Sequence, residues 1–348
     1  MSKEHMMPAT IADEAQLEDL LPEPYPEDVE FASQLEGDIL VLGAGGKMGP
    51  TLIKRILRAN EEADADTTVY AASRYSDPEV KEKLQSWGAE TIEADLLDDD
   101  ALESLPECRN VIYLVGMKFG TTGQEPMTWA INSYLPGRVA RRFEDSRITA
   151  LSTGNVYPPV PVDSGGSVET NEPGPVGEYA QSCLGRERVF QYFSEANDTP
   201  TCLLRLNYAV ELRYGVLLDL AKRIYAEEPV PLEMGHVNVI WQGDANSVCF
   251  RSLQLADSPS DILNVTGPNV LSVRDLAERF AEEFGCNVTF QGEEKETALL
   301  NDASRCHDLF GEPKMPIDEL VEHVASWVER DQPVHGKPTK FHVRDGEF

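Results

Sequence analysis

The sequence predicts an α/β fold in which helices cover both faces of a doubly wound parallel sheet. Apolar runs of strand length alternate with helical stretches from residue 37 onward, and this alternation is typical of parallel sheets with crossover helices. In addition, the first strong strand passes without a spacer into a glycine cluster and then into a helix. We expect strands at 39–42, 68–72, 90–94, 110–115, 148–152, 201–206 and 261–265.

The first 36 residues predict an acidic N-terminal arm that precedes the sheet. They contain many carboxylates, several prolines and a single lysine, Lys3, and they show no sustained hydrophobic period. Such a composition is typical of a loosely ordered segment. We expect one short helix within it, around residues 15–21.

The glycine cluster after the first strand predicts a dinucleotide-binding turn. Lys47 and Met48 stand between the last two of three glycines with the spacing G-x-x-G-x-x-G, which are Gly43, Gly46 and Gly49. Glycines let the backbone turn tightly and approach a pyrophosphate. The helix expected from about residue 50 to 59 would offer the anion its free N–H groups and positive dipole end. A strand-to-helix turn without a ligand would give the same pattern, so the spacing alone leaves both readings open.

Two stretches depart from the strand and helix alternation. Residues 158–178 contain five prolines and four glycines, and we expect them to form a long loop over the carboxyl edge of the sheet. Loops of this length are usually functional. After about residue 211 the pattern changes to helices and short strands, and the capping box at 272–275 is expected to begin a helix.

These patterns divide the chain into four parts. The acidic arm covers residues 1–36, and a Rossmann dinucleotide-binding domain covers 37–210. A smaller α+β substrate-binding part covers 211–330, from which the strand at 261–265 is expected to return to the sheet. A polar tail at 331–348 is expected to wrap the surface.

Composition and charge restrict the kinds of partner. The 348 residues include 61 acidic and 30 basic side chains, a formal charge of −31, which argues against nucleic acids or an anionic membrane as partners. No run approaches the roughly 18 apolar residues of a membrane span, and the N-terminus lacks a signal-peptide pattern, so we expect a cytoplasmic protein. The six cysteines form no C-x-x-C pair, which suggests neither a metal site nor disulfides. Whether the chain forms a homodimer stays open.

Several motifs in their order resemble the extended short-chain dehydrogenase/reductase family, which includes nucleotide-sugar epimerases, dehydratases and related reductases. Besides the glycine spacing, they are Asn132 in the helix after the fourth strand, LSTGNVYPP at 151–159, Tyr179-Ala-Gln-Ser-Cys183, and NVTGP at 264–268. The resemblance covers about residues 37–325. It implies hydride transfer between NAD or NADP and a hydroxylated, sugar-like substrate.

The resemblance implies a role for each of three polar residues. Thr153 matches the hydroxyl that hydrogen-bonds a substrate hydroxyl or carbonyl. Tyr179 matches the acid/base, whose phenol passes a proton to or from the substrate oxygen. An unperturbed phenol titrates near about 10, so it needs help to act at neutral pH. Asn132 matches the helix residue that orders water or backbone near the site.

The chain departs from the family pattern at Cys183. At this cofactor-contacting position the family has a lysine, which binds the nicotinamide ribose and lowers the pKa of the tyrosine, and a neutral cysteine can do neither. Three interpretations stay open: the chemistry is lost, another cation replaces the lysine, or the tyrosine works unassisted and slowly. Lys118, after the fourth strand, is our first candidate for a replacement, and Arg186 is the second.

The end of the second strand bears on the choice of cofactor. An acidic residue there would bind the adenosine ribose of NAD, but the chain has Ser73 and Arg74. Arg74 can stack on adenine or pair with a 2′-phosphate, and Lys47 adds a second cation nearby, so NADP is favoured over NAD. The resemblance implies that Asp95-Leu96 contacts the adenine. It also implies that Leu114-Val115-Gly116 passes beside the ribose of the cofactor.

We therefore expect an NAD(P)-dependent oxidoreductase or epimerase that acts on a hydroxylated sugar-like or nucleotide-sugar substrate, with Tyr179 as acid/base. The alternative is a catalytically inactive NAD(P)-binding regulatory or interaction protein. Retention of Thr153 and Tyr179 favours the enzyme, whereas Cys183 favours the alternative.

Overall fold

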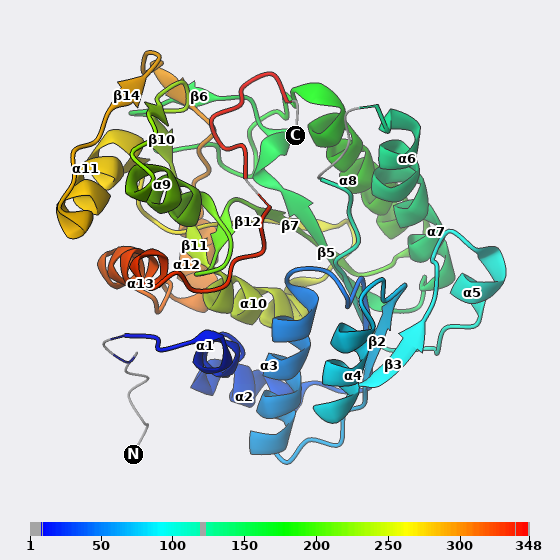
Figure 1. Cartoon of the computed structure of the whole chain (residues 1–348). Coiled ribbons are helices and arrows are strands. Elements are labelled where there is room, and N and C mark those ends of the chain that lie inside the picture. The colour runs from blue at the N-terminus through cyan, green and yellow to red at the C-terminus, as the bar shows by residue number, and fades with distance from the viewer. Residues whose placement is uncertain (1–7, 9, 119–122, 338, 347–348) are drawn as a thin grey trace.

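A seven-stranded sheet forms the centre of the molecule (Figure 1). The computed structural model describes residues 8, 10–118, 123–337 and 339–346. The strand order is β12-β7-β5-β4-β1-β2-β3, and all neighbours are parallel, which confirms the predicted doubly wound sheet. All seven predicted strands are present: β1 Ile39–Leu42, β2 Val69–Ser73, β3 Glu90–Glu93, β4 Asn110–Tyr113, β5 Arg147–Thr153, β7 Thr201–Leu206 and β12 Asp261–Val265.

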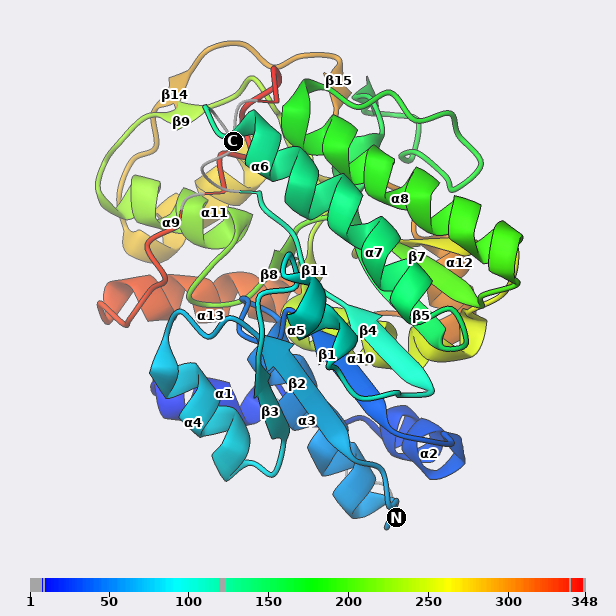
Figure 2. The same ribbon diagram turned by 90° about the vertical axis from the view of Figure 1, so that its right-hand side faces the viewer.

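Helices cover both faces of this sheet, which is why its strands read as continuous apolar runs. Leu40 and Val41 of β1, for example, point to opposite faces and both are fully buried. One face packs on α3 (Gly49–Glu62) and α10 (Gln242–Arg251). The other face packs on α5 (Asp99–Glu103), α7 (Leu135–Arg142) and α8 (Gly177–Asn197), and Figure 2 shows α7 and α8 side by side.

A second hydrophobic core lies beyond the carboxyl edge of the sheet, between three helices: α9 Val216–Tyr225, α11 Val273–Phe284 and α13 Ile317–Glu329. The predicted start of α11 is confirmed, because the Ser272 Oγ accepts a hydrogen bond from the Asp275 N–H at 3.1 Å. Short strand pairs complete this part: β8 Ala209–Val210 with β11 Ile240–Trp241, β9 Val230–Pro231 with β14 Phe290–Gln291, β10 His236–Val237 with β13 Leu271–Ser272, and β6 Val160–Pro161 with β15 Thr297–Ala298.

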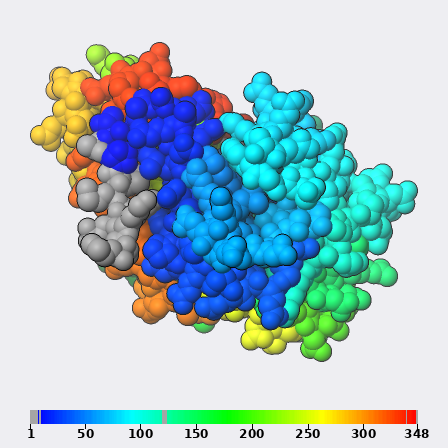
Figure 3. Space-filling model, turned by 90° about the horizontal axis from the view of Figure 1, so that it is seen from below, coloured from blue at the N-terminus to red at the C-terminus, as the bar shows by residue number. Residues whose placement is uncertain are grey.

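The prediction of a loosely ordered N-terminal arm is wrong for residues 10–36. They form α1 (Glu14–Leu20), which is the expected short helix, and α2 (Pro26–Gln34). Leu17 is buried in the second core, and the Asp28 carboxylate is buried against Arg55. The N-terminal segment, dark blue in Figure 3, lies beside the red C-terminal part. Residues 1–7 and 9 lie outside the described residues.

Three remaining α-helices complete the outer layer: α4 Pro78–Ser86, α6 Glu125–Trp129 and α12 Ser304–Phe310. None of the helices in the described ranges combines the length and the apolar character that a membrane crossing requires. Within the same ranges, no three His, Cys, Asp or Glu side chains gather as they would around a metal ion.

Candidate active site

The glycine loop connects β1 to α3 at the point where the strand order reverses, between β1's neighbours β2 and β4. In doubly wound sheets this switch point is where ligands bind. Gly43 has a φ of +89°, a backbone conformation that favours glycine. A Cβ on Gly49 would lie 2.2 Å from the Ala44 carbonyl oxygen, so Gly49 permits close packing of helix on loop. The N-cap residue Met48 makes no side-chain hydrogen bond to the first turn, which leaves the N–H groups of that turn for an anion.

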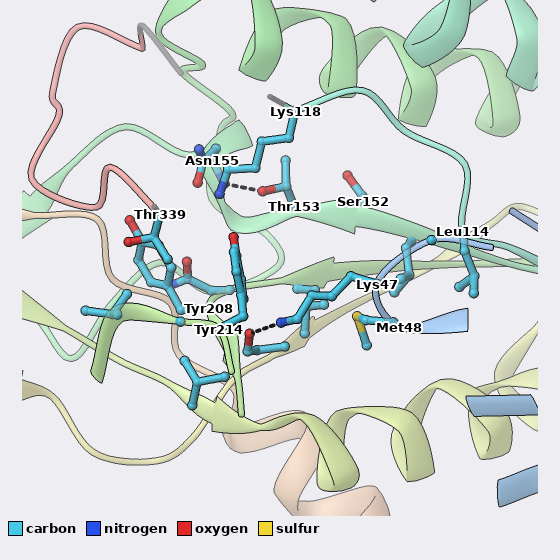
Figure 4. A pocket seen from close by; sticks show the side chains of 18 of the residues that line it. Lys47, Met48, Leu114, Lys118, Ser152, Thr153, Asn155, Tyr208, Tyr214 and Thr339 are labelled. Carbon is cyan, nitrogen blue, oxygen red and sulfur yellow. Dashed lines mark hydrogen bonds between the residues drawn. The ribbon is translucent and has the colours of Figure 1, made fainter. Parts of the chain in front are cut away.

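A cavity of about 230 Å³ opens beside this loop, across the carboxyl ends of β1, β4, β5 and β7. Lys118 and Lys47 reach into it from different sides (Figure 4). It brings together these predicted site residues: Gly43, Gly46, Lys47, Met48, Gly49, Leu114, Lys118, Thr153 and Tyr179. The other predicted site residues do not line it: Ser73, Arg74, Asp95, Leu96, Val115, Gly116, Asn132 and Cys183.

Thr153 and Tyr179 come from different elements and meet at this cavity. Thr153 ends β5, and its Oγ1 accepts a hydrogen bond from the Asn155 N–H at 3.2 Å. Tyr179 lies in the first turn of α8. Burial and the neighbouring Cys183 raise the pKa of Tyr179 well above its usual value, while the Arg186 guanidinium and a hydrogen bond with Thr153 oppose this shift. The phenol is therefore protonated at neutral pH, and only additional positive charge near its oxygen would favour the phenolate.

Lys118 is the cation that faces the cavity beside Tyr179. Its Nζ lies 6.0 Å from the centroid of the Tyr179 ring and 5.8 Å from that of the Tyr208 ring. Burial lowers the pKa of Lys118 to about 8, although Cys183 and Asp219 act in the opposite direction. Lys118 therefore carries its charge at neutral pH and loses it in mildly alkaline solution.

Arg186 lies behind the cavity, in the interior. Its Nη1 donates to the Leu151 carbonyl at 2.6 Å, and its Nη2 donates to the Asn132 Oδ1 at 2.9 Å. A Cβ on Gly116 would lie 3.0 Å from this Nη2, so Gly116 gives the guanidinium its space. Burial raises the pKa of the Cys183 thiol, which keeps that side chain neutral, while the Arg186 charge acts against this shift. The Arg186 guanidinium thus donates its hydrogen bonds to Leu151 and Asn132 in the protein interior and acts on the site only through its charge.

Asn132 is fully buried in a π-helical turn, η1 (Ala130–Tyr134), a feature common at functional sites. Its Oδ1 accepts from the Met117 N–H at 2.8 Å, and its Nδ2 donates to the Met117 carbonyl at 3.0 Å and to the Ser182 Oγ at 3.0 Å. Asn132 therefore holds the backbone of the residue that precedes Lys118.

The prediction that Lys47 stands beside Arg74 is wrong. The Lys47 Nζ donates to the Ala209 carbonyl at 2.9 Å and lies 3.9 Å from the centroid of the Tyr214 ring. Ala209 follows β7, which lies on the opposite side of β1 from β2 and Arg74. Burial lowers the pKa of Lys47 to about 7, and the Glu211 carboxylate opposes this shift.

The adenine side of the predicted site lies at the ends of β2 and β3. Arg74 is exposed there, and Ser73 borders the glycine loop, because a Cβ on Gly45 would lie 2.8 Å from the Ser73 Oγ. Asp95 follows β3, and its Oδ1 accepts a hydrogen bond from the Leu97 N–H at 3.0 Å. These residues lie at the carboxyl edge of the sheet, on the other side of the glycine loop from Tyr179.

Sequence reasoning missed several residues that line the cavity: Asn155, Asn207, Tyr208, Tyr214 and Thr339. Asn207 and Tyr208 follow β7 directly, so their position at the end of a predicted strand was a usable signal. Thr339 comes from the C-terminal tail, and no sequence pattern connects it to the sheet.

Comparisons with known proteins identify the chain's relatives. Residues 39–233 match the sequence model of the NAD dependent epimerase/dehydratase family. Among solved structures, a UDP-glucuronic acid 4-epimerase from Bacillus cereus in complex with NAD is 17% identical, with a TM-score of 0.69 over 84% of this chain and 99% of that chain. A UDP-glucose 4-epimerase from Thermotoga maritima with UDP-glucose is 16% identical, with a TM-score of 0.70 over 84% and 99% respectively. At these identities the likeness concerns the fold. No curated protein sequence matches the chain.

Proposed function

The chain belongs to the NAD-dependent epimerase/dehydratase family, and on this basis we propose that it is an NAD(P)-dependent oxidoreductase or epimerase of the extended short-chain type. Its substrate is a hydroxylated sugar-like molecule or a nucleotide sugar. One observation carries the proposal: Tyr179, Thr153 and Lys118 line the same cavity as the glycine loop. The structural neighbours from Bacillus cereus and Thermotoga maritima hold a nucleotide sugar or NAD, which supports this substrate class.

The dinucleotide fits the glycine loop, because Gly46 borders the cavity and the first turn of α3 has uncapped N–H groups. When bound, its nicotinamide supplies a carbon that accepts or returns a hydride. The Thr153 hydroxyl orients the substrate oxygen. The Tyr179 phenol gives its proton to that oxygen during reduction, and its phenolate takes the proton back during oxidation. Lys118 stabilises the phenolate electrostatically from the cavity side, and Arg186 does so from the interior.

Cofactor selection depends on Arg74. The exposed guanidinium at the end of β2 can pair with a 2′-phosphate, whereas Lys47 is engaged with Ala209 and Tyr214. NADP therefore binds more tightly than NAD, with Arg74 as the residue that distinguishes them.

A second candidate function is a cofactor-binding regulatory or interaction protein without turnover. It is favoured by Cys183, a buried neutral thiol where the family has a lysine, together with the raised pKa of Tyr179. Such a protein would bind NAD or NADP with an affinity that does not depend on Tyr179.

An assay of the pure protein with UDP-sugars and either cofactor separates the two functions. We expect epimerised or oxidised sugar from the wild type, detected by NMR, and a loss of turnover in Tyr179→Phe. Tyr192→Phe is the matched control, because Tyr192 is on the same helix but exposed on the surface. Cofactor binding without turnover on any UDP-sugar would favour the regulatory function. Turnover that survives Tyr179→Phe would contradict both.

A further inference from the structure

A second cavity, of about 350 Å³, lies between α9 and the C-terminal tail, and we call it the tail cavity. Its wall carries six basic side chains that the proposed reaction does not use: Arg213, Lys222, Arg223, Lys337, Lys340 and His342. In a chain with 61 acidic and 30 basic residues, a cavity with this lining is unexpected.

Carboxylates offset only part of the positive charge of the tail cavity. Arg213 pairs with Glu14 and Glu211, and the charges of Lys222 and Arg223 act to lower the pKa of Asp219, which burial raises. Asp219 is directed at the tail, since its Oδ2 accepts hydrogen bonds from the Thr339 N–H at 2.7 Å and the Thr339 Oγ1 at 2.6 Å. The Glu228 Oε2 lies 3.7 Å from the Arg223 Nη1. In the described part of the chain, three ammonium groups of this wall form neither a hydrogen bond nor an ion pair: those of Lys222, Lys337 and Lys340.

The tail that carries two of these lysines is held on both sides of them. Before them, the His335 N–H donates to the Arg213 carbonyl at 3.0 Å. After them, Phe341 is 4% exposed, and the Arg344 Nη1 donates to the Thr297 carbonyl at 2.8 Å. Lys340 itself has a φ of +52°, a conformation that is costly for a non-glycine residue and persists only where the surroundings impose it. The described residues that flank the two lysines are therefore anchored to the rest of the protein.

We propose that the tail cavity binds a phosphate-bearing ligand with at least two negative charges. Lysine ammonium groups bind phosphate as point charges, and a volume of this size admits a pyrophosphate or a sugar phosphate. Binding at this site does not require turnover, so it goes beyond the proposed function.

Two sources of such a phosphate are consistent with the geometry. Thr339 lines the candidate active-site cavity, and its hydrogen-bond partner Asp219 lines the tail cavity, so the two cavities are neighbours at this residue pair. The first source is a substrate that reacts at Tyr179 and extends its phosphate end into the tail cavity. The other source is a separate phosphorylated metabolite that binds there alone.

Calorimetric titration of the full-length chain with inorganic pyrophosphate tests the site. We expect saturable binding that weakens at least tenfold in Lys337→Gln/Lys340→Gln and persists in Gly46→Val, which blocks the glycine loop. The control Arg141→Gln/Arg188→Gln removes the same charge from exposed positions on α7 and α8 and should leave the affinity unchanged. The absence of saturable binding, or equal weakening by the control, would overturn the proposal.

The source of the phosphate is decided by adding UDP-glucose to the pyrophosphate complex. Displacement of pyrophosphate would assign the tail cavity to the phosphate end of the substrate. Simultaneous binding of both ligands would assign it to a separate phosphorylated ligand, and in either case the phosphate site stands.

Discussion

Lys118 is the residue on which the pH dependence of turnover should depend. In the proposed mechanism the charge of Lys118 supports the Tyr179 phenolate from 6.0 Å. Burial lowers the pKa of Lys118 to about 8, so its charged fraction falls as the pH rises through that value. We therefore expect turnover to decline above about pH 8. In Lys118→Arg this decline should disappear, since arginine stays protonated. Rate profiles of both proteins check this, and an identical alkaline decline in the variant would count against Lys118.

Arg74 is the residue that should decide between the two cofactors. A charge-assisted hydrogen bond is worth about 1.5–3 kcal/mol, so NADP should bind at least roughly tenfold more tightly than NAD. Arg74→Ala should erase most of that preference without weakening NAD to the same extent. Calorimetric titration with each cofactor measures both affinities. Equal affinities in the wild type would mean that Arg74 does not read the 2′-phosphate.

The glycine loop shows how one element serves folding and binding through different residues. Gly46→Val should abolish cofactor binding and leave the fold intact, because Gly46 faces the cavity. Gly49→Ala should instead lower the melting temperature, since its Cβ would meet the Ala44 carbonyl oxygen at 2.2 Å. Titration of both variants with cofactor and their thermal unfolding test whether Gly46 serves binding and Gly49 serves folding. A Gly46→Val protein with wild-type cofactor affinity would remove the dinucleotide assignment.

Elements whose pattern is local could be predicted from the sequence. The strands of the sheet are short apolar runs because helices cover both faces of the sheet. Ser272 is the N-cap of α11, and its hydroxyl accepts a hydrogen bond from the N–H of Asp275, three positions ahead. Contacts between distant segments could not be predicted. Lys47 turns to Ala209 and Tyr214, more than a hundred residues away, and Thr339 reaches the cavity from the tail. No periodicity encodes such partners.

At the scale of the whole molecule, the N-terminal arm joins the sheet to the second core. The Asp28 carboxylate is fully buried, pairs with Arg55 and lies 3.3 Å from the Nε of Arg251 in α10. Leu17 is buried in the second core. The acidic composition of this segment misled the sequence analysis, because its carboxylates have specific basic partners elsewhere in the chain.

Asp28→Ala should therefore destabilise the whole protein. Removing one partner of a buried ion pair leaves an uncompensated charge and costs about 3–5 kcal/mol. Glu36→Ala is a suitable control, because Glu36 pairs with Arg109 at an exposed site where ion pairs contribute little. Denaturant unfolding gives both values. Equal stability of the two variants would show that the arm is not integral to the fold.

The central claim is that Tyr179 transfers the proton with the help of Lys118 in place of the missing lysine. The most direct test is the single-turnover rate of hydride transfer to bound cofactor in Lys118→Met, with Cys183→Ala as the control. We expect Lys118→Met to lower the rate by about 10²–10⁴-fold, the range for lost acid/base catalysis, with cofactor affinity unchanged. Cys183→Ala should cost little. A wild-type rate in Lys118→Met would contradict the account.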